Sequence, residues 1–158
     1  MSSTNTRLKH FSFALSLSAL LVSSFQAVAE ASPRVMSVDW TQTETMLALG
    51  GVPVGVAQGQ DYDAWVKSPP LPPQTKDVGL RTQPNIERIY ELRPDRIFIA
   101  PYFSSMKHRL VDIAPVTTID LYESGITDWS VLTRFTRRFG EELGREAEAE
   151  ALIQQYEK

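Results

Sequence analysis

Short apolar strand patterns alternate with helical patterns along most of this chain, and this alternation restricts the fold more than any other feature. The predicted strands cover residues 34–40, 52–57, 96–100 and 117–121. Predicted helices between or after them cover residues 43–49, 84–92 and 106–113. Because alternating strands and helices form parallel sheets with helices on their faces, the sequence predicts an α/β fold with a largely parallel sheet.

Two further helices are predicted at the end of the sequence. An apolar stripe runs from Trp129 to Leu143, and Gly144 ends it. A new helical pattern starts at Arg145 and reaches residue 158 without a capping signal. We therefore expect a truncated chain, or one lobe of a larger protein, with the lobe over residues 30–144.

The first 29 residues have the pattern of a secretory signal peptide. Basic residues precede an apolar run from Phe11 to about Val22, and Ala27-Val28-Ala29 forms an A-x-A cleavage site. The apolar run is too short to be a convincing membrane span. The chain has no cysteine, which excludes a disulfide framework and a lipid-modified cysteine at the cleavage site. We expect export and cleavage after Ala29.

The charge balance argues against a nucleic-acid partner. The predicted mature chain keeps 14 basic and 19 acidic residues, because the first 29 residues hold two basic and no acidic side chains. Neutralisation of phosphates dominates nucleic-acid affinity, so a mildly acidic chain has little to offer such a ligand.

The sequence contains no catalytic constellation. The predicted mature chain has a single histidine, His108, and a lone helical histidine is most often a surface or packing residue. The H-E-x-x-H, G-x-S-x-G and P-loop patterns are absent. Asp61 and Asp63 lie two residues apart in a predicted loop, where carboxylates are usually solvated. The residues themselves therefore do not indicate an enzyme.

The stretch DVGLRTQPN, residues 77–85, places an arginine at a strand-to-helix junction. Gly79 relaxes the backbone, Thr82 can cap a helix, and Pro84 suits a first helical turn. Arg81 ends a long loop, predicted over residues 58–83, which carries four prolines. Long ordered loops inside compact domains are usually functional.

Aromatic residues accompany Arg81 at the predicted ligand edge of the sheet. Tyr62 and Trp65 precede the prolines, and Tyr102 and Phe103 follow the strand that ends at residue 100. Because ligands bind outside the carboxyl ends of parallel strands, these side chains predict an aromatic pocket with one strong donor.

Structural roles for the same residues remain open at this point. Trp65 could brace the prolines, and Tyr102 could cover a strand end. Arg81 could pair with Asp77.

Three stretches resemble a known family: DWTQTETMLALGGVPVGVA (39–57), DYDAWVKSPPLPPQTKDVGLRTQPNIERIYELRPDRI (61–97) and, more weakly, EAEALIQQYEK (148–158). The chain is similar to the amino-terminal half of FhuD-like iron(III)-hydroxamate (ferrichrome-type) periplasmic binding proteins, within the siderophore and cobalamin binding proteins of ABC importers. The resemblance covers nearly all of residues 34–158. It implies two lobes joined by one long helix, which would start within residues 145–158, and a ligand held in the shallow cleft between the lobes.

The resemblance also implies roles for individual residues. Trp65 and Arg81 fall on positions that contact the siderophore, with Arg81 donating to hydroxamate oxygens. Tyr102 and Phe103 compete for one aromatic position, because this sequence is shorter than the family pattern around IAPYFSS. Glu87 matches a surface glutamate that docks on basic residues of the inner-membrane permease, although it could be an ordinary helix-surface carboxylate. No cofactor and no direct protein ligand to iron is implied, since the siderophore fills the metal's coordination shell.

We therefore expect a monomeric periplasmic binding protein that delivers ferric hydroxamate siderophores to an ABC permease with its ATPase. A ferric ion held by three hydroxamates is neutral, which suits one arginine among aromatic residues. An anionic ferric catecholate would call for several basic residues. The alternatives are a cobalamin or other siderophore binder, a periplasmic enzyme whose catalytic half is missing, and a lobe that binds nothing. A single lobe should bind weakly, because half the cleft wall is absent.

Overall fold

The computed structural model describes residues 32–122, 125 and 128–157. The predicted signal peptide, residues 1–29, lies outside the described residues, so its cleavage stays a prediction. Within the described residues, no helix is both long enough and apolar enough to cross a membrane.

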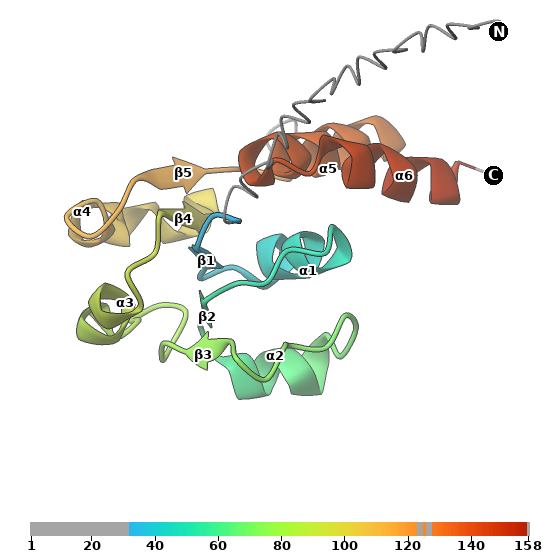
Figure 1. Cartoon of the computed structure of the whole chain (residues 1–158). Coiled ribbons are helices and arrows are strands. Elements are labelled where there is room, and N and C mark those ends of the chain that lie inside the picture. Colours follow the sequence, from blue (N-terminus) through green and yellow to red (C-terminus); the bar gives the residue numbers. More distant parts are fainter. Residues whose placement is uncertain (1–31, 123–124, 126–127, 158) are drawn as a thin grey trace, which may run out of the picture. The chain divides into compact units, whose positions relative to one another are not determined.

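Five parallel strands form one sheet with the order β3-β2-β1-β4-β5 (Figure 1). The strands are β1 (Val35–Ser37), β2 (Gly55–Val56), β3 (Lys76–Asp77), β4 (Arg96–Ile99) and β5 (Val116–Thr118). In the register of the sheet, Met36 of β1 lies opposite Gly55 on one side and Ile97 on the other. This architecture confirms the predicted α/β class with a parallel sheet.

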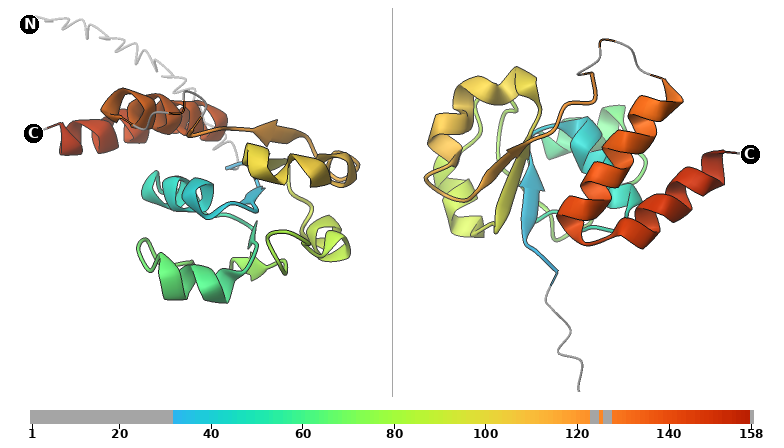
Figure 2. Two further views of the ribbon diagram at one scale, coloured as in Figure 1. Left: turned by 180° about the vertical axis from the view of Figure 1, so that it is seen from behind. Right: turned by 90° about the horizontal axis from the view of Figure 1, so that it is seen from above.

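Helices cover both faces of the sheet (Figure 2). One face carries α1 (Trp40–Ala48), α2 (Gly59–Trp65), α5 (Trp129–Leu143) and α6 (Glu146–Tyr156). The other face carries α3 (Ile86–Leu92), the 3₁₀ helix η1 (Pro101–Met106) and α4 (Lys107–Leu110).

Two hydrophobic clusters follow from this layering, because successive strand residues point to opposite faces. Val35 and Phe98 pack with Phe139 in the cluster under α1 and α5. Their neighbours Met36 and Ile97 belong to the second cluster, which lies under α3, η1 and α4.

Helix starts and stops are fixed by local chemistry. Asp39 caps α1 by accepting the N–H of Gln42, and Asn85 and Asp128 cap α3 and α5 in the same way. Gly144 ends α5 with φ +64°, a left-handed value that glycine adopts without a Cβ clash. The predicted helix break at Gly144 is therefore confirmed, whereas the lobe boundary over residues 30–144 stays a prediction.

Several predicted elements differ from the structure; the predicted strands 52–57 and 117–121 shorten to β2 and β5, and the predicted helix 43–49 starts earlier, at Trp40. The loop predicted over residues 58–83 contains α2 and β3, which lack a detectable period because α2 buries only Gly59 and Tyr62 and β3 has two residues. The first strand ends at Ser37 rather than residue 40, because Asp39 already caps α1. The helix predicted over 106–113 is instead η1 followed by the four-residue α4.

The strand order reverses beside β1. The chain builds β2 and then β3 on one side of β1, and returns to place β4 and β5 on the other side. The carboxyl ends of β1 and β4 therefore flank a topological switch point, where open α/β sheets bind their ligands.

Candidate functional site at the carboxyl edge of the sheet

Several hydrogen bonds hold the loop that carries Arg81. The Asp77 carboxylate accepts the N–H groups of Gly59 (2.8 Å) and Gly79 (2.7 Å). Gly79 pairs with Pro84 in an antiparallel bridge and has φ +92°, a conformation that favours glycine. The loop therefore folds back on itself and presents Arg81 directly after β3.

Gln58 links the ends of β2 and β3. Its N–H donates to the carbonyl of Gly79 at 2.7 Å, and its side-chain Oε1 accepts the N–H of Arg81 at 3.1 Å. The backbone position of Arg81 is thus set by the neighbouring strand as well as by its own loop.

The Arg81 guanidinium lies between two aromatic rings. Its Cζ is 4.4 Å from the ring centroid of Trp40 and 5.3 Å from that of Phe103. Its Nη2 donates to Oδ2 of Asp39 at 3.3 Å, and 28 % of the Arg81 side chain and 13 % of the Asp39 side chain are exposed. Cation–π contacts of this kind strengthen when the cation is partly desolvated.

One donor of this guanidinium is left unused. Among the described residues, the Nε of Arg81 is the buried side-chain polar atom without a hydrogen-bond partner. A buried donor without a partner costs about 1–3 kcal/mol. Such atoms are rare in native proteins, which makes Arg81 a candidate functional residue.

The partners of Arg81 come from both sides of the switch point. Asp39 and Trp40 follow β1, and Phe103 lies in η1, which follows β4. The Trp40 ring is itself fixed, because its Nε1 donates to the carbonyl of Ala57 at 2.9 Å. Arg81 therefore joins the exits of β1, β3 and β4 at one edge of the sheet.

Tyr102 and Phe103 take opposite positions. Phe103 is 3 % exposed and supports Arg81 from within, whereas Tyr102 is 81 % exposed. Their rings meet edge to face with centroids 5.1 Å apart. Of the two candidates for the aromatic ligand position, Tyr102 is the accessible one.

The expectation that Tyr62 lines the pocket is not met by the structure, because its side chain is fully buried. Its hydroxyl donates to the carbonyl of Pro69 at 2.9 Å, and its ring meets Trp40 edge to face at 6.4 Å. Burial raises the pKa of Tyr62 to about 12, with the charges of Glu44 and Asp63 adding to the effect. Tyr62 supports Trp40 from behind instead of facing a ligand.

Trp65 is the last residue of α2, and 80 % of it is exposed. Its ring lies outside the stack that Trp40, Arg81 and Phe103 form. Trp65 is therefore a surface aromatic residue, available for contact with a ligand or with another chain segment.

Sequence reasoning missed Asp39 and Trp40. Arg81 pairs with Asp39 and not with Asp77, whose carboxylate is occupied by backbone N–H groups. Both missed residues directly follow β1 at the same edge as the other candidates. The rule that ligands bind at the carboxyl ends of parallel strands would have included them.

The closed space at the switch point is small. A pocket of about 40 Å³ lies there, lined by residues that include Asp39, Ala100, Asp120 and Tyr122. Ligand pockets usually hold roughly 300–1,000 Å³. This small pocket is therefore too small to hold such a ligand by itself.

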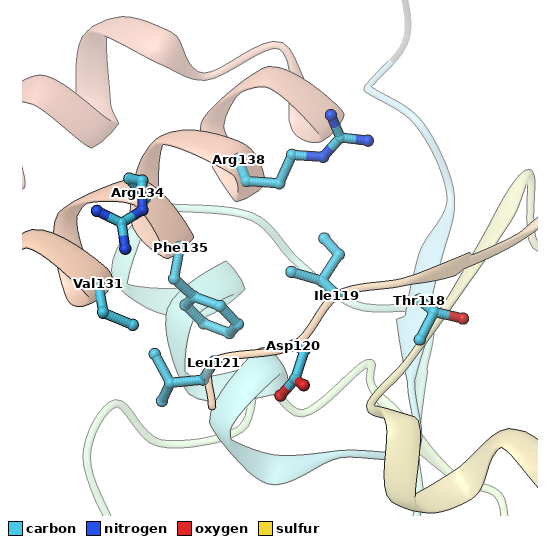
Figure 3. A pocket seen from close by; sticks show the side chains of 8 residues that line it. All are labelled: Thr118, Ile119, Asp120, Leu121, Val131, Arg134, Phe135 and Arg138. Atoms are coloured by element: carbon cyan, nitrogen blue, oxygen red, sulfur yellow. The ribbon is translucent and has the colours of Figure 1, made fainter. Parts of the chain in front are cut away.

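A larger pocket, of about 400 Å³, lies beside α5 (Figure 3). Arg134 and Arg138 extend from α5 on one side, and Ile119, Asp120 and Leu121 belong to the segment after β5 on the other. Arg138 forms ion pairs with Glu141 and Glu142 of its own helix. None of the site residues predicted from the sequence lines this pocket.

Glu87 is exposed in the first turn of α3. It lines a groove of about 730 Å³ between α3 and α4, together with Tyr90, His108 and Asp112. His108 is on the surface, and its Nδ1 lies 2.8 Å from the carbonyl of Ser105. Over the described residues, the structure contains no group of three or more His, Cys, Asp or Glu side chains that could hold a metal ion.

Residues 35–158 match the family model described as periplasmic binding protein. The chain belongs to the periplasmic binding protein family. Its fold matches the amino-terminal lobe of FhuD-like members.

Several relatives of this periplasmic binding protein have named ligands. It is 33 % identical to the iron(3+)-hydroxamate-binding protein FhuD of Escherichia coli (strain K12), over 91 % of this chain and 49 % of that protein. The crystal structure of the siderophore binding protein FhuD from Vibrio cholerae with Fe³⁺–Desferal bound is similar, with a TM-score of 0.74 and 30 % identity over 79 % of this chain and 47 % of that one. The periplasmic catecholate-siderophore binding protein VctP from Vibrio cholerae has a TM-score of 0.61 and 29 % identity, over 80 % of this chain and 44 % of that one.

These relatives are substrate-binding proteins rather than enzymes, and they share siderophores as ligands. The chain spans about half the length of the curated E. coli relative that it matches.

Proposed function

We propose that this periplasmic binding protein binds ferric hydroxamate siderophores and delivers them to an inner-membrane ABC permease with its ATPase, for iron uptake. The observation that carries the proposal is the Arg81 guanidinium, held between Trp40 and Phe103 at the carboxyl edge of the sheet. It acts as a binding protein and not as an enzyme.

The chemistry of this edge suits a ferric trihydroxamate. Such a complex is neutral and presents hydroxamate oxygens among apolar linkers. Arg81 supplies donors for the oxygens, and the exposed rings of Trp65 and Tyr102 supply apolar contact area. The siderophore fills the iron's coordination shell, so no protein ligand to the metal and no cofactor is needed.

One physical argument and the ligands of two relatives support hydroxamate siderophores over other siderophores. Arg81 is a single guanidinium whose charge is balanced by Asp39, whereas an anionic catecholate complex calls for several basic groups. The E. coli relative is an iron(3+)-hydroxamate-binding protein, and the V. cholerae FhuD structure holds Fe³⁺–Desferal. A catecholate complex, as in VctP, and cobalamin are the competing ligands.

The proposal places this lobe opposite a second one. In that arrangement α6 begins the helix that joins the lobes, and the open edge around Arg81 forms one wall of the ligand cleft. The protein acts as a monomer in the periplasm after cleavage of the signal peptide. Glu87, exposed on α3, docks on basic residues of the permease.

Isothermal titration calorimetry with a neutral ferric trihydroxamate tests the function directly. Loss of hydrogen bonds from a charged donor costs about 1.5–3 kcal/mol, so Arg81→Ala should weaken binding by about one to two decades. Arg88→Ala removes an exposed arginine from α3 and should leave the affinity unchanged. Calorimetry is preferred to tryptophan emission because Arg81 contacts Trp40, so its removal changes the fluorescence by itself.

Two results would contradict the proposal. If wild type and Arg81→Ala bind the trihydroxamate with equal affinity, Arg81 does not contact the ligand. Tighter binding of a ferric catecholate or of cobalamin than of the trihydroxamate would assign the site to another ligand class. If the 158-residue chain gives no heat with any of the three ligands, the same titration on a chimera carrying the carboxyl-terminal half of the E. coli relative decides whether the second wall is required.

A further inference from the structure

The carboxylate of Asp39 is held rigidly in its place beside Arg81. Its Oδ1 accepts the N–H of Gln42 at 3.1 Å as the cap of α1, and its Oδ2 accepts Nη2 of Arg81 at 3.3 Å. Only 13 % of the Asp39 side chain is exposed. A carboxylate fixed in this way cannot swing away when a ligand approaches the guanidinium.

The guanidinium is equally constrained. The rings of Trp40 and Phe103 lie 4.4 and 5.3 Å from its Cζ, and its Nε is buried. The positive and negative charges therefore stay paired at the ligand edge. An approaching group meets hydrogen-bond donors whose net charge is cancelled.

Within the small pocket the added charge is negative, although Arg134 and Arg138 lie beside the same Asp120 in the neighbouring pocket at α5. The small pocket at the switch point is lined by Asp39 and by a second carboxylate, Asp120, and its described lining includes no lysine, arginine or histidine. Low-dielectric walls lined by one sign of charge repel ligands of the same sign.

We propose that Asp39 determines the charge class of the ligand: by cancelling the charge of Arg81, it lets the site accept uncharged ferric complexes and disfavours anionic ones. This inference rests on the proposed siderophore function and makes Asp39 a specificity residue of that site. Arg81 then recognises its ligand by directed hydrogen bonds, and net electrostatic attraction contributes little.

Asp39→Asn tests the proposal, because asparagine caps a helix about as well as aspartate and removes only the charge. Affinities are measured by calorimetry for a neutral ferric trihydroxamate and an anionic ferric tricatecholate. The variant should shift the affinity ratio toward the anionic complex by about tenfold, and added salt should reduce the shift. Asp39→Glu keeps the charge and should keep the ratio near that of wild type.

Asp128→Asn is the matched control. Asp128 caps α5 through the N–H of Val131 at 3.0 Å, as Asp39 caps α1, but it does not pair with Arg81. The ratio of the two affinities in Asp128→Asn should equal the ratio in wild type. An equal loss of affinity for both complexes in Asp39→Asn, or an unchanged ratio, would overturn the proposal and leave Asp39 as a helix cap. Wild-type chain that binds the anionic complex as tightly as the neutral one would also overturn it.

A second measurement does not depend on any siderophore. The chain has three tryptophans, so Trp65→Phe and Trp129→Phe together leave Trp40, whose ring contacts Arg81, as the one fluorophore. In this background, Asp39→Asn should raise quenching by iodide about twofold and leave quenching by neutral acrylamide unchanged. An unchanged iodide-to-acrylamide ratio would refute the electrostatic role. If neither the wild-type chain nor the chimera with the second lobe binds a ferric complex, the proposed function fails, and this ratio still decides the role of Asp39.

Discussion

Replacement of Gln42 by leucine tests how the sheet is held together behind the candidate site. The Gln42 side chain is 1 % exposed. Its Nε2 donates to the carbonyl of Ile119 at 2.9 Å, and its Oε1 accepts the hydroxyl of Ser37 at 2.8 Å. This one amide therefore ties α1 both to the end of β1 and to the segment after β5.

The expected loss of stability follows from these two bonds. Leucine has a similar size but makes neither bond, and each lost bond contributes about 0.5–1.5 kcal/mol. The carbonyl of Ile119 is left buried without this partner, at a further cost of about 1–3 kcal/mol. The leucine side chain buries more apolar surface than glutamine, which offsets about 1 kcal/mol of this loss. These terms together span about 1–5 kcal/mol, and we expect the free energy of unfolding to fall by about 2–3 kcal/mol, near the middle of that range.

Urea unfolding followed by circular dichroism measures this change. With an m-value of about 1.5 kcal/mol per molar urea, the midpoint should fall by about 1.5–2 M. Gln154→Leu makes the same substitution on the exposed side of α6 and should change the free energy by less than about 0.5 kcal/mol. If Gln42→Leu unfolds at the wild-type midpoint with an unchanged m-value, the amide bridge does not stabilise the sheet.

Two further predictions concern Tyr62 and Glu87. The raised pKa of Tyr62, about 12 against about 10 when unfolded, gives stability that is complete below about pH 10 and is lost as the pH rises toward 12. Urea unfolding at about pH 8 and pH 11 measures this loss of stability, which Tyr62→Phe should reduce. Tyr90→Phe, at a surface position, is the control and should leave the loss unchanged. Equal losses in both variants would exclude Tyr62 as the cause. Glu87→Gln should lower the binding protein's stimulation of the reconstituted permease ATPase at least about tenfold. Glu146→Gln, at an exposed position on α6, is the control. Full stimulation by the Glu87→Gln variant would exclude that docking contact.

Elements with strong local signals were predictable from the sequence. The helix after Pro84, the strand from Arg96 and the break at Gly144 depend on apolar spacing and backbone preference, which neighbouring residues determine. The helix α2 and strand β3 were missed, because α2 buries few side chains and β3 pairs through its backbone with a distant strand. Their stability comes from partners that no local window contains.

The sequence by itself determined the fold class, the edge of the sheet where the candidate ligand residues gather, and the placement of Arg81 at a strand-to-helix junction. These properties follow from periodicity and from glycine and proline geometry, which are local. Only the tertiary structure decided that Arg81 pairs with Asp39, which lies 42 residues away in the chain.

The tertiary structure also decided which aromatic side chains face outward. Tyr62 and Trp65 lie in the same helix, yet Tyr62 is buried against Trp40 and Trp65 is exposed. Tyr102 and Phe103 are adjacent and take opposite positions for the same reason. Burial of a side chain depends on what packs against it, and the ring that covers Tyr62 comes from Trp40 in α1, far away in the sequence.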